Sequence, residues 1–231
     1  MGYPEHIAII LDGNRRFAKK LMQQPWKGHE WGAGKVRKVC DWAREVGIKK
    51  LTLWGFSTDN FNRPKREFDY IIKVFDKEIE FLLNDPEIEK NKINIKFIGR
   101  IEMFPEFLQK KMKELTEKTK DNSNFQIYIA LAYGGKPELI DACQKLAADV
   151  KLGKLNPEEI NEDKFEEYLY MRDAPDLIIR TGGDKRTSGF LPWQGAYAEY
   201  LFMDKCWPEF EKEDLINALD EFTVRERRFG R

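Results

Sequence analysis

The chain has 231 residues, enough for a substantial core, and we expect one domain over residues 1–231. Lys plus Arg and Asp plus Glu each number 40, so no overall field draws the protein to nucleic acid or to an anionic membrane. Cys40, Cys143 and Cys206 stand far apart without metal-ligand spacing, and no window nears the roughly 18 apolar residues of a membrane span, so we expect a cytoplasmic protein without disulfides or zinc.

Short apolar runs recur along the chain and are separated by segments of helical character. This alternation is typical of a parallel sheet with crossover helices, so we predict an α/β fold with a central, mainly parallel six-stranded sheet flanked by helices. The predicted strands are 7–11, 51–56, 93–98, 125–133, 177–180 and 200–203.

The first predicted strand ends in Asp12, Gly13 and Asn14, followed by Arg15 and Arg16. A helix starting near Asn14 would direct backbone N–H groups at an anion, Gly13 would allow close approach, and Arg16 would add a charged fork. A carboxylate beside a phosphate makes sense chiefly with a divalent cation between them, and oxygen ligands favour Mg²⁺. An ordinary Asp-Gly turn remains the alternative at this stage.

His29 is one of two histidines, and the sequence places it just before a helix that carries Val36 and Val39. It is as consistent with a structural role as with a ligand role. Ser57, Asn60 and Arg63 follow the second strand, where Asn60 could cap a helix or bind a substrate.

Apolar residues over 68–82 follow the spacing of one helical face, and Val74, Phe81 and Leu83 widen that face. A wide core stripe explains the pattern, and so does a helix that walls a cavity. The polar segments 84–92 and 153–164 are predicted as loops, the second ending in a helix start.

The fifth predicted strand ends in an arginine and glycine cluster, with Arg180, Arg186 and Ser188 around a Gly-Gly pair. Two guanidinium groups, hydroxyls and accessible N–H groups indicate a phosphate site, and an ordinary surface loop is the alternative. Because ligands bind outside the carboxyl ends of parallel strands, the clusters after the first, second and fifth strands should open on one edge of the sheet.

Taken together, these segments resemble the cis-prenyltransferase family, which includes undecaprenyl diphosphate synthases. The matching segments are HIAIILDGNRRFAKK, GHEWGAGKV, LTLWGFSTDNFNRP, DLIIRTGGDKRTSGFLPWQGAYAEYLF and the terminal RERRFGR. The resemblance implies repeated cis condensation of isopentenyl diphosphate onto an allylic diphosphate primer, farnesyl or geranylgeranyl diphosphate. It also implies a homodimer, an apolar product tunnel, and contact with a membrane surface when the long-chain product, a glycan-carrier lipid precursor, leaves.

The resemblance assigns roles to individual residues. Asp12 and Asn60 become catalytic, Asp12 and Glu199 become Mg²⁺ ligands, and Arg228 and Gly230 reach a neighbouring subunit. Whether Asn60, Asp12 or released diphosphate accepts the final proton stays open. The remaining implied substrate contacts are Gly13, Asn14, Arg15, Arg16, Phe17, His29, Ser57, Thr58, Asp59, Phe61, Arg63, Arg180, Arg186, Thr187 and Ser188.

The chain departs from the family pattern at one notable position. Pro25 stands where many members carry a phosphate-binding arginine, with Lys27 nearby as a substitute, so primer choice cannot be carried over. Two other functions fit the sequence less well. A dehalogenase-type phosphohydrolase needs a second Asp where Asn14 stands, and a non-catalytic partner subunit typically lacks the metal Asp and the arginine loop that this chain retains.

Overall fold

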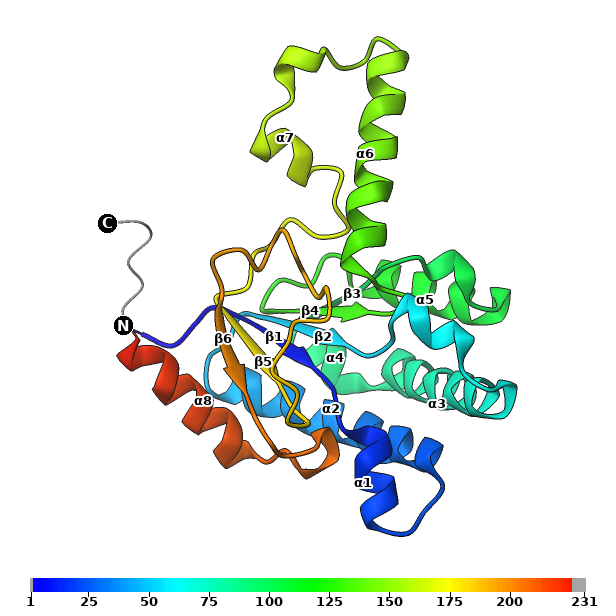
Figure 1. Cartoon of the computed structure of the whole chain (residues 1–231), viewed down its shortest axis with the longest axis vertical. Helices are drawn as coiled ribbons and strands as arrows, with labels where there is room; N and C mark the ends of the chain where they lie inside the picture. Colours follow the sequence, from blue (N-terminus) through cyan, green and yellow to red (C-terminus); the bar gives the residue numbers. More distant parts are fainter. Residues whose placement is uncertain (1, 226–231) are drawn as a thin grey trace.

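Six parallel strands form one sheet in the computed structural model, which describes residues 2–225 (Figure 1). The strand order is β3-β4-β2-β1-β5-β6. The strands are β1 His6–Ile10, β2 Lys50–Trp54, β3 Ile93–Ile98, β4 Phe125–Ala130, β5 Leu177–Arg180 and β6 Glu199–Phe202. The α/β fold is therefore confirmed, although β2 and β4 end earlier than predicted, and Arg228 and Gly230 lie outside the described residues.

Helices connect the strands as crossovers. They are α1 Asn14–Lys20, α2 Gly28–Glu45, α3 Lys65–Asn84, α4 Pro86–Lys90, α5 Glu106–Thr119, α6 Gly135–Lys151, α7 Glu162–Glu166 and α8 Lys212–Val224. The helix start at Asn14 and the long helix across 68–83 are confirmed. The prediction that His29 precedes a helix is wrong, because His29 lies in the first turn of α2.

The prediction of a loop over 84–92 is wrong, because α4 occupies its middle. The Asp85 side chain caps the helix by accepting a hydrogen bond from Glu87 N at 3.0 Å, and Pro86 takes the first helical position. Ile88 is buried and ties this short helix to the core. The segment was predicted as a loop from its polar composition, although Asp85 and Pro86 are a typical helix start.

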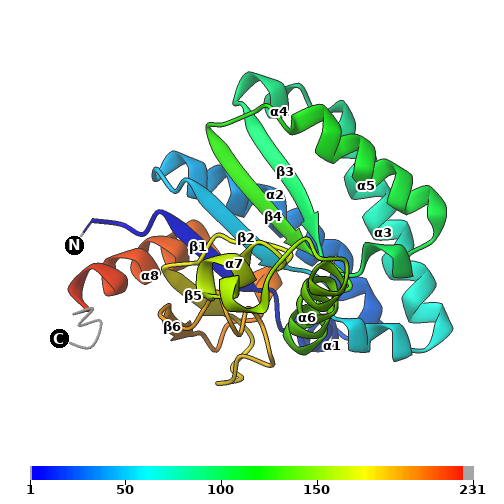
Figure 2. The same ribbon diagram turned by 90° about the horizontal axis from the view of Figure 1, so that it is seen from above.

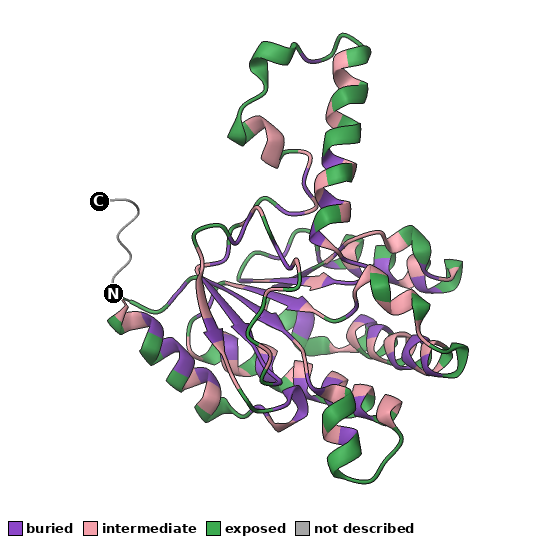
Figure 3. Ribbon diagram, viewed as in Figure 1, coloured by how far each residue is buried: buried purple, intermediate pink, exposed green. Residues whose placement is uncertain are grey.

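The two faces of the sheet carry separate apolar clusters. On one face Ile7 and Ile9 of β1 pack in a cluster with residues of α2, α3, α5 and α8. On the other face Ala8 and Ile10 share a cluster with Phe190, which belongs to an irregular segment. This alternation follows from the two-residue period of a strand and buries β1 on both sides (Figure 3).

The hairpin of α6 and α7 stands away from the sheet in Figure 1, and α6 is seen nearly end-on in Figure 2. Most of this arm is exposed. The buried residues of α6 lie in its first half, and they are Gly135, Glu138 and Ala142. Ile140 and Leu152 are more than half exposed. The arm therefore contributes little to the core, whereas the base of α6 is part of it.

β1 lies at the switch point of the sheet. It pairs with β2 on one side and with β5 on the other. Strands β2, β4 and β3 extend the sheet from one side of β1, and β5 and β6 extend it from the other side. Open α/β sheets bind ligands in the crevice at such a point, outside the carboxyl ends of the strands. Ile10, Trp54 and Arg180 end the three strands and mark this edge.

Candidate active site

A polar pocket opens where β1, β2 and β5 end, as the sequence predicts. Its lining includes Asp12, Gly13, Asn14, Arg15, Arg16, His29, Ser57, Asn60, Arg63, Arg180 and Ser188. The three polar clusters therefore do meet on one edge of the sheet. The pocket brings together arginines from three separate segments of the chain, at Arg15 and Arg16, at Arg63 and at Arg180.

Arg180, at the end of β5, holds the centre of this pocket. Its side chain is 5% exposed, and Nη1 donates to Ser188 Oγ at 2.8 Å and to the Arg186 carbonyl at 2.6 Å. Nη2 donates to Asp12 Oδ2 at 2.8 Å. Arg180 Nε is buried with no hydrogen-bond partner among the described residues, as is Asn14 Oδ1. Buried polar atoms without partners are uncommon and often mark functional sites.

Asp12 is fixed by its neighbours through both its backbone and its side chain. Its carbonyl accepts from Thr181 Oγ1 and from Trp207 N, both at 2.8 Å, and its carboxylate lies 3.1 Å from Arg16 Nη2. Burial alone would raise the pKa of Asp12, but the hydrogen bond from Arg180 and the charge of Arg16 outweigh it and lower the pKa. Asp12 is therefore ionised at neutral pH.

Glycines let the strand ends come close together. Gly13 has φ +103°, and a Cβ there would lie 2.7 Å from the backbone of Cys206. A Cβ on Gly182 would lie 2.6 Å from Arg16 Nη2. A side chain at position 13 would collide with Cys206, and one at position 182 would displace the Arg16 guanidinium beside Asp12.

A second carboxylate, Asp184, contacts the same arginines and was missed by the sequence analysis. Its Oδ2 lies 2.8 Å from Arg186 Nη2, 3.4 Å from Arg180 Nη2 and 3.6 Å from Arg16 Nη2. Guanidinium groups that converge on carboxylates can also bind diphosphate oxygens, because their planar fork donates paired charge-assisted hydrogen bonds to either anion. The sequence signal for Asp184 was its position inside the arginine-rich segment RTGGDKR.

His29, Arg63 and Glu67 form a buried polar group on the other side of the pocket. Arg63 Nη1 donates to His29 Nε2 at 3.0 Å and to Glu67 Oε1 at 3.1 Å, and the Glu67 side chain is 4% exposed. Burial first, then the charges of Arg63 and Arg15, lower the pKa of His29 to about 3. His29 is therefore a neutral acceptor, and Glu67 neutralises the arginines beside it. The sequence analysis missed Glu67, whose only signal is its place four residues after Arg63.

Asn60 caps a helix, which is one of the two roles that the sequence left open, and Ser57 takes part in the same cap. Ser57 Oγ accepts from Asp59 N at 3.1 Å, and Asn60 Oδ1 accepts from Ser57 N at 3.0 Å, which caps the 3₁₀ helix Thr58–Asn62. Both residues also line the pocket. The cap fixes the loop that carries them.

Several residues that the resemblance assigned to the substrate do not line the pocket. Phe17 packs against Trp31 with ring centroids 5.4 Å apart, and Phe61 packs against Phe56 at 5.1 Å. Arg186 lies at the rim with its side chain 63% exposed. Thr58, Asp59 and Thr187 are also outside the lining, as is the exposed Lys27.

Glu199 lies far from Asp12 within one chain. It begins β6 and pairs with Leu177, which pairs in turn with Ile7 near the start of β1. Asp12 is five residues beyond Ile7, roughly 16 Å away at the rise of a strand. Arg225 Nη1 donates to the Glu199 carboxylate at 3.0 Å. One chain therefore does not bring the two predicted Mg²⁺ ligands together.

The donor set around Asp12 fits Mg²⁺ in one specific way. No group of three or more metal-ligating side chains gathers among residues 2–225. Mg²⁺ usually binds through one or two carboxylates and substrate phosphates rather than in an all-protein cage. The ionised Asp12 carboxylate among arginines that attract a diphosphate matches that mode of binding.

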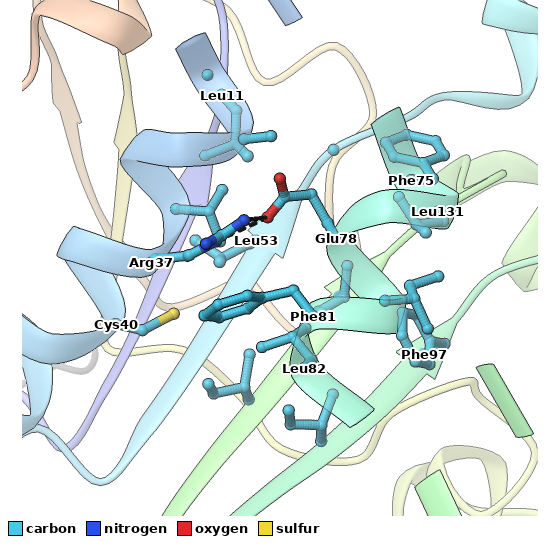
Figure 4. A pocket seen from close by; sticks show the side chains of 18 of the residues that line it. Leu11, Arg37, Cys40, Leu53, Phe75, Glu78, Phe81, Leu82, Phe97 and Leu131 are labelled. Atoms are coloured by element: carbon cyan, nitrogen blue, oxygen red, sulfur yellow. Dashed lines mark hydrogen bonds and ion pairs between the residues drawn. The ribbon is translucent and has the colours of Figure 1, made fainter. Parts of the chain in front are cut away.

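An apolar cavity (Figure 4) adjoins the polar pocket, and Leu11, Asn14, His29 and Gly55 line both. Strands β2, β3 and β4 form its floor, and α2 and α3 form its walls, with Cys40, Phe75 and Leu82 among the lining residues. Of the residues that widen the face of α3, Phe81 lines the cavity, whereas Val74 and Leu83 pack in or near the core. The suggestion of a cavity wall therefore holds for Phe81.

An ion pair closes part of the wall between α2 and α3. Arg37 Nη2 lies 2.6 Å from Glu78 Oε2, and the Arg37 guanidinium lies 3.7 Å from the centre of the Phe81 ring (Figure 4). Cys40 points from α2 toward the same ring. The cavity is thus lined mainly by apolar side chains, and a charged pair links α2 and α3 beside it.

Within residues 2–225, none of the helices combines the length and the hydropathy that crossing a membrane requires.

Comparisons with known proteins agree with this geometry. A family model described as "Putative undecaprenyl diphosphate synthase" matches residues 10–230. Tritrans,polycis-undecaprenyl-diphosphate synthase (geranylgeranyl-diphosphate specific) of Methanopyrus kandleri is 44% identical over 99% of this chain and 85% of its own length. The protein of the same name from Methanocaldococcus jannaschii is 44% identical over 99% of this chain and 83% of its own.

Two solved structures share the fold. Lavandulyl diphosphate synthase from Lavandula x intermedia, in complex with dimethylallyl diphosphate, has a TM-score of 0.92 and 33% identity and covers 99% of both chains. A "probable undecaprenyl diphosphate synthase" from Campylobacter jejuni has a TM-score of 0.82 and 31% identity over the full length of both chains. This chain belongs to the undecaprenyl diphosphate synthase family of cis-prenyltransferases.

Proposed function

We propose that this protein condenses isopentenyl diphosphate repeatedly, in cis, onto an allylic diphosphate primer and releases diphosphate in each cycle. One observation carries the proposal: a pocket of converging arginines around an ionised Asp12 opens directly into an apolar cavity. The pocket suits diphosphates, and the cavity suits a growing hydrocarbon. The names of the relatives from M. kandleri and M. jannaschii favour geranylgeranyl diphosphate as the primer.

The two diphosphates would occupy opposite sides of the pocket. We assign the primer diphosphate to Asp12, Arg16 and the residues around His29, because His29 and the neighbouring Leu11 and Asn14 line both the polar pocket and the apolar cavity. Isopentenyl diphosphate would lie against Arg180, Ser188 and the rim residue Arg186. Both reacting groups would then be held side by side, which removes much of the entropic cost of their encounter.

Charge development explains why arginines gather at this site. As the allylic C–O bond breaks, negative charge grows on the departing diphosphate, so Arg16 and neighbouring donors stabilise the transition state more than the ground state. Bound Mg²⁺, held by Asp12 and phosphate oxygens, would supply further charge stabilisation. The apolar cavity excludes water from the cation-like allylic carbons.

A proton leaves the isopentenyl unit at the end of each cycle. Asn60 carries a neutral amide and is a poor base, so we assign it to positioning, through the cap that it forms with Ser57. Asp12, with its lowered pKa, and the released diphosphate are the acceptors that this site offers. If released diphosphate accepts the proton, a variant without the Asp12 carboxylate should retain single-turnover chemistry. If Asp12 accepts it, that variant should lose this chemistry.

We also propose a homodimer, a cytoplasmic location and contact with a membrane surface during release of the product. The exposed apolar residues Ile140 and Leu152 on the projecting arm support an interface. The distance between Glu199 and Asp12 supports a second copy as the source of any further Mg²⁺ ligand. We infer that the long-chain product serves as a precursor of a glycan-carrier lipid.

The proposed function is tested by incubating the pure protein with labelled isopentenyl diphosphate, Mg²⁺ and primers of ten, fifteen or twenty carbons. Chromatography of the extracted products would identify the primer and the product length together. We expect long-chain products, most rapidly from the twenty-carbon primer, and their loss when EDTA replaces Mg²⁺. The absence of any chain elongation with all three primers would refute the proposal.

A further inference from the structure

Tyr133 lies just beyond β4 and contacts both substrate loops, although it lines neither cavity. It is fully buried. Its N–H donates to the Phe56 carbonyl at 3.0 Å, and its carbonyl accepts from Thr58 N at 3.2 Å. These bonds extend the sheet pairing by one bridge, between Tyr133 and Ser57. The backbone of Tyr133 therefore holds the loop after β2, which carries Ser57 and Asn60.

The side chain of Tyr133 holds the loop after β5. Its hydroxyl accepts a hydrogen bond from Leu191 N at 3.2 Å. The ring packs edge-on against Phe190, with centroids 5.9 Å apart. One residue thus connects the segment that presents Asn60 with the segment that presents Ser188.

A buried carboxylate orients the hydroxyl. Tyr133 Oη donates to Glu138 Oε2 at 2.5 Å, and Glu138 Oε1 accepts from Tyr170 N and from Gln194 Nε2, both at 3.0 Å. Glu138 is fully buried in the second turn of α6. Burial raises the pKa of Tyr133 well above its ordinary value, so the phenol keeps its proton and donates to Glu138 while its lone pair accepts from Leu191.

The loop after β5 has a backbone shape that depends on outside support. Ser188 and Leu191 have φ values of +52° and +46°, a region that residues with a side chain rarely occupy. Gly135 N donates to the Gly189 carbonyl at 3.0 Å, and a Cβ on Gly135 would lie 2.2 Å from that oxygen. The first turn of α6 and the Tyr133 hydroxyl therefore brace the loop from one side, while Arg180 holds Ser188 from the other.

We propose that the Tyr133 hydroxyl is a positioning group that sets the loop over residues 187–191, and through Ser188 the isopentenyl diphosphate pocket, relative to the loop over residues 57–60. This inference rests on the proposed function. The hydroxyl contacts the Ser188 side of the site directly, whereas the backbone on the Asp12 side is held by Thr181 and Trp207. Its loss should therefore affect one substrate and spare the other.

Tyr133→Phe removes the hydroxyl and keeps the ring. Leu191 N then loses its acceptor, and we expect the KM for isopentenyl diphosphate to rise about tenfold, the size of one lost hydrogen bond, with an unchanged KM for the primer. The matched control is Tyr128→Phe. Tyr128 lies on β4, is buried, and donates its hydroxyl to the Asp173 carboxylate rather than bonding to either loop. We expect that control to lower thermal stability and leave both KM values unchanged.

Glu138→Gln provides a second test if Tyr133→Phe proves too unstable to assay. It keeps the volume but weakens the anchor of the hydroxyl, so the same KM should rise by a smaller factor. Equal KM values for wild type and for the folded variants, or an equal rise in both KM values, would overturn the inference. Wild-type turnover is measured first, so a failure of the proposed function is recognised before any variant is compared.

Discussion

Arg180 shows how one side chain organises a site that the sequence displays only as separate motifs. The fifth-strand cluster predicts a phosphate loop, but its bonds to Asp12, Ser188 and the Arg186 carbonyl depend on how β1 and β5 pair. Asp12 and Arg180 were predictable because both end buried strands. Trp207 was not predictable, because its contact with Asp12 comes from tertiary packing, and Glu67 had only its place four residues after Arg63 as a signal.

Asp12→Asn removes the charge and keeps the shape. Because that charge would hold Mg²⁺ at the departing diphosphate, we expect turnover to fall by about a hundred- to a thousandfold, as when one group that stabilises a transition state is lost. Steady-state rates with both substrates measure the effect, and thermal unfolding checks that the fold persists. A rate within threefold of wild type would remove Asp12 from the chemistry.

Arg186→Ala tests the assignment of the two diphosphates. Arg186 lies at the rim beside Asp184, so its loss should raise the KM for isopentenyl diphosphate about tenfold and change the KM for the primer much less. Lys185→Ala is the matched control, since it removes an adjacent exposed cation from the same loop. The opposite ranking of the two KM values would mean that the pockets are exchanged.

The two histidines predict how stability depends on pH. Burial, the largest cause for both, lowers the pKa of His6 to about 4 and that of His29 to about 3, below the unfolded value of roughly 6.5. The unfolded chain therefore binds more protons between these values, and stability present above pH 6.5 is lost as pH falls. As the pH falls from 6.5 to 5, the free energy of unfolding should decrease by about 2 kcal/mol for each histidine.

Urea unfolding at pH 7 and pH 5 measures that loss. Because the chain has only these two histidines, His6→Gln and His29→Gln should each reduce the difference between the two pH values by about half. The carboxylates with lowered pKa, such as Asp12, add a loss of the same sign at lower pH. An undiminished difference in both variants would assign the acid sensitivity to other groups.

At the scale of elements, periodicity located every strand and the long helix α3, because buried strands and amphipathic helices leave regular patterns. It missed α4, whose five residues are too few for a period and whose signal is the cap at Asp85. It also placed His29 before α2 rather than within it, because Gly28 begins that helix without a side-chain cap. Helix ends are decided by such local bonds more than by apolar spacing.

The wall formed by α2 and α3 should set the length of the product. Cys40→Phe adds a ring to the cavity from α2, opposite Phe81, and we expect shorter polyprenyl products at a similar initial rate. Cys143→Phe, on the exposed part of α6, is the matched control and should leave the product distribution unchanged. Chromatography of the dephosphorylated products measures both, and equal distributions would mean that the chain grows elsewhere.

At the scale of the whole molecule, the parallel sheet and the switch point at β1 followed from the order of apolar runs and polar strand ends. The projecting arm of α6 and α7 did not, because a helix that leaves the core carries no pattern of its own. The placement of Glu199 at the opposite edge of the sheet also required the register of β5 and β6. The projecting arm and the position of Glu199 are the two features that support the proposed homodimer.

The central claim is that two diphosphates lie side by side at the carboxyl edge of the sheet, with the hydrocarbon in the adjoining cavity. A crystal structure with isopentenyl diphosphate, Mg²⁺ and a non-reactive thio analogue of geranylgeranyl diphosphate tests it most directly. We expect one diphosphate against Asp12 and Arg16, the other against Arg180 and Ser188, and the prenyl chain between α2 and α3. Diphosphates bound elsewhere, or a prenyl chain outside that cavity, would contradict the account.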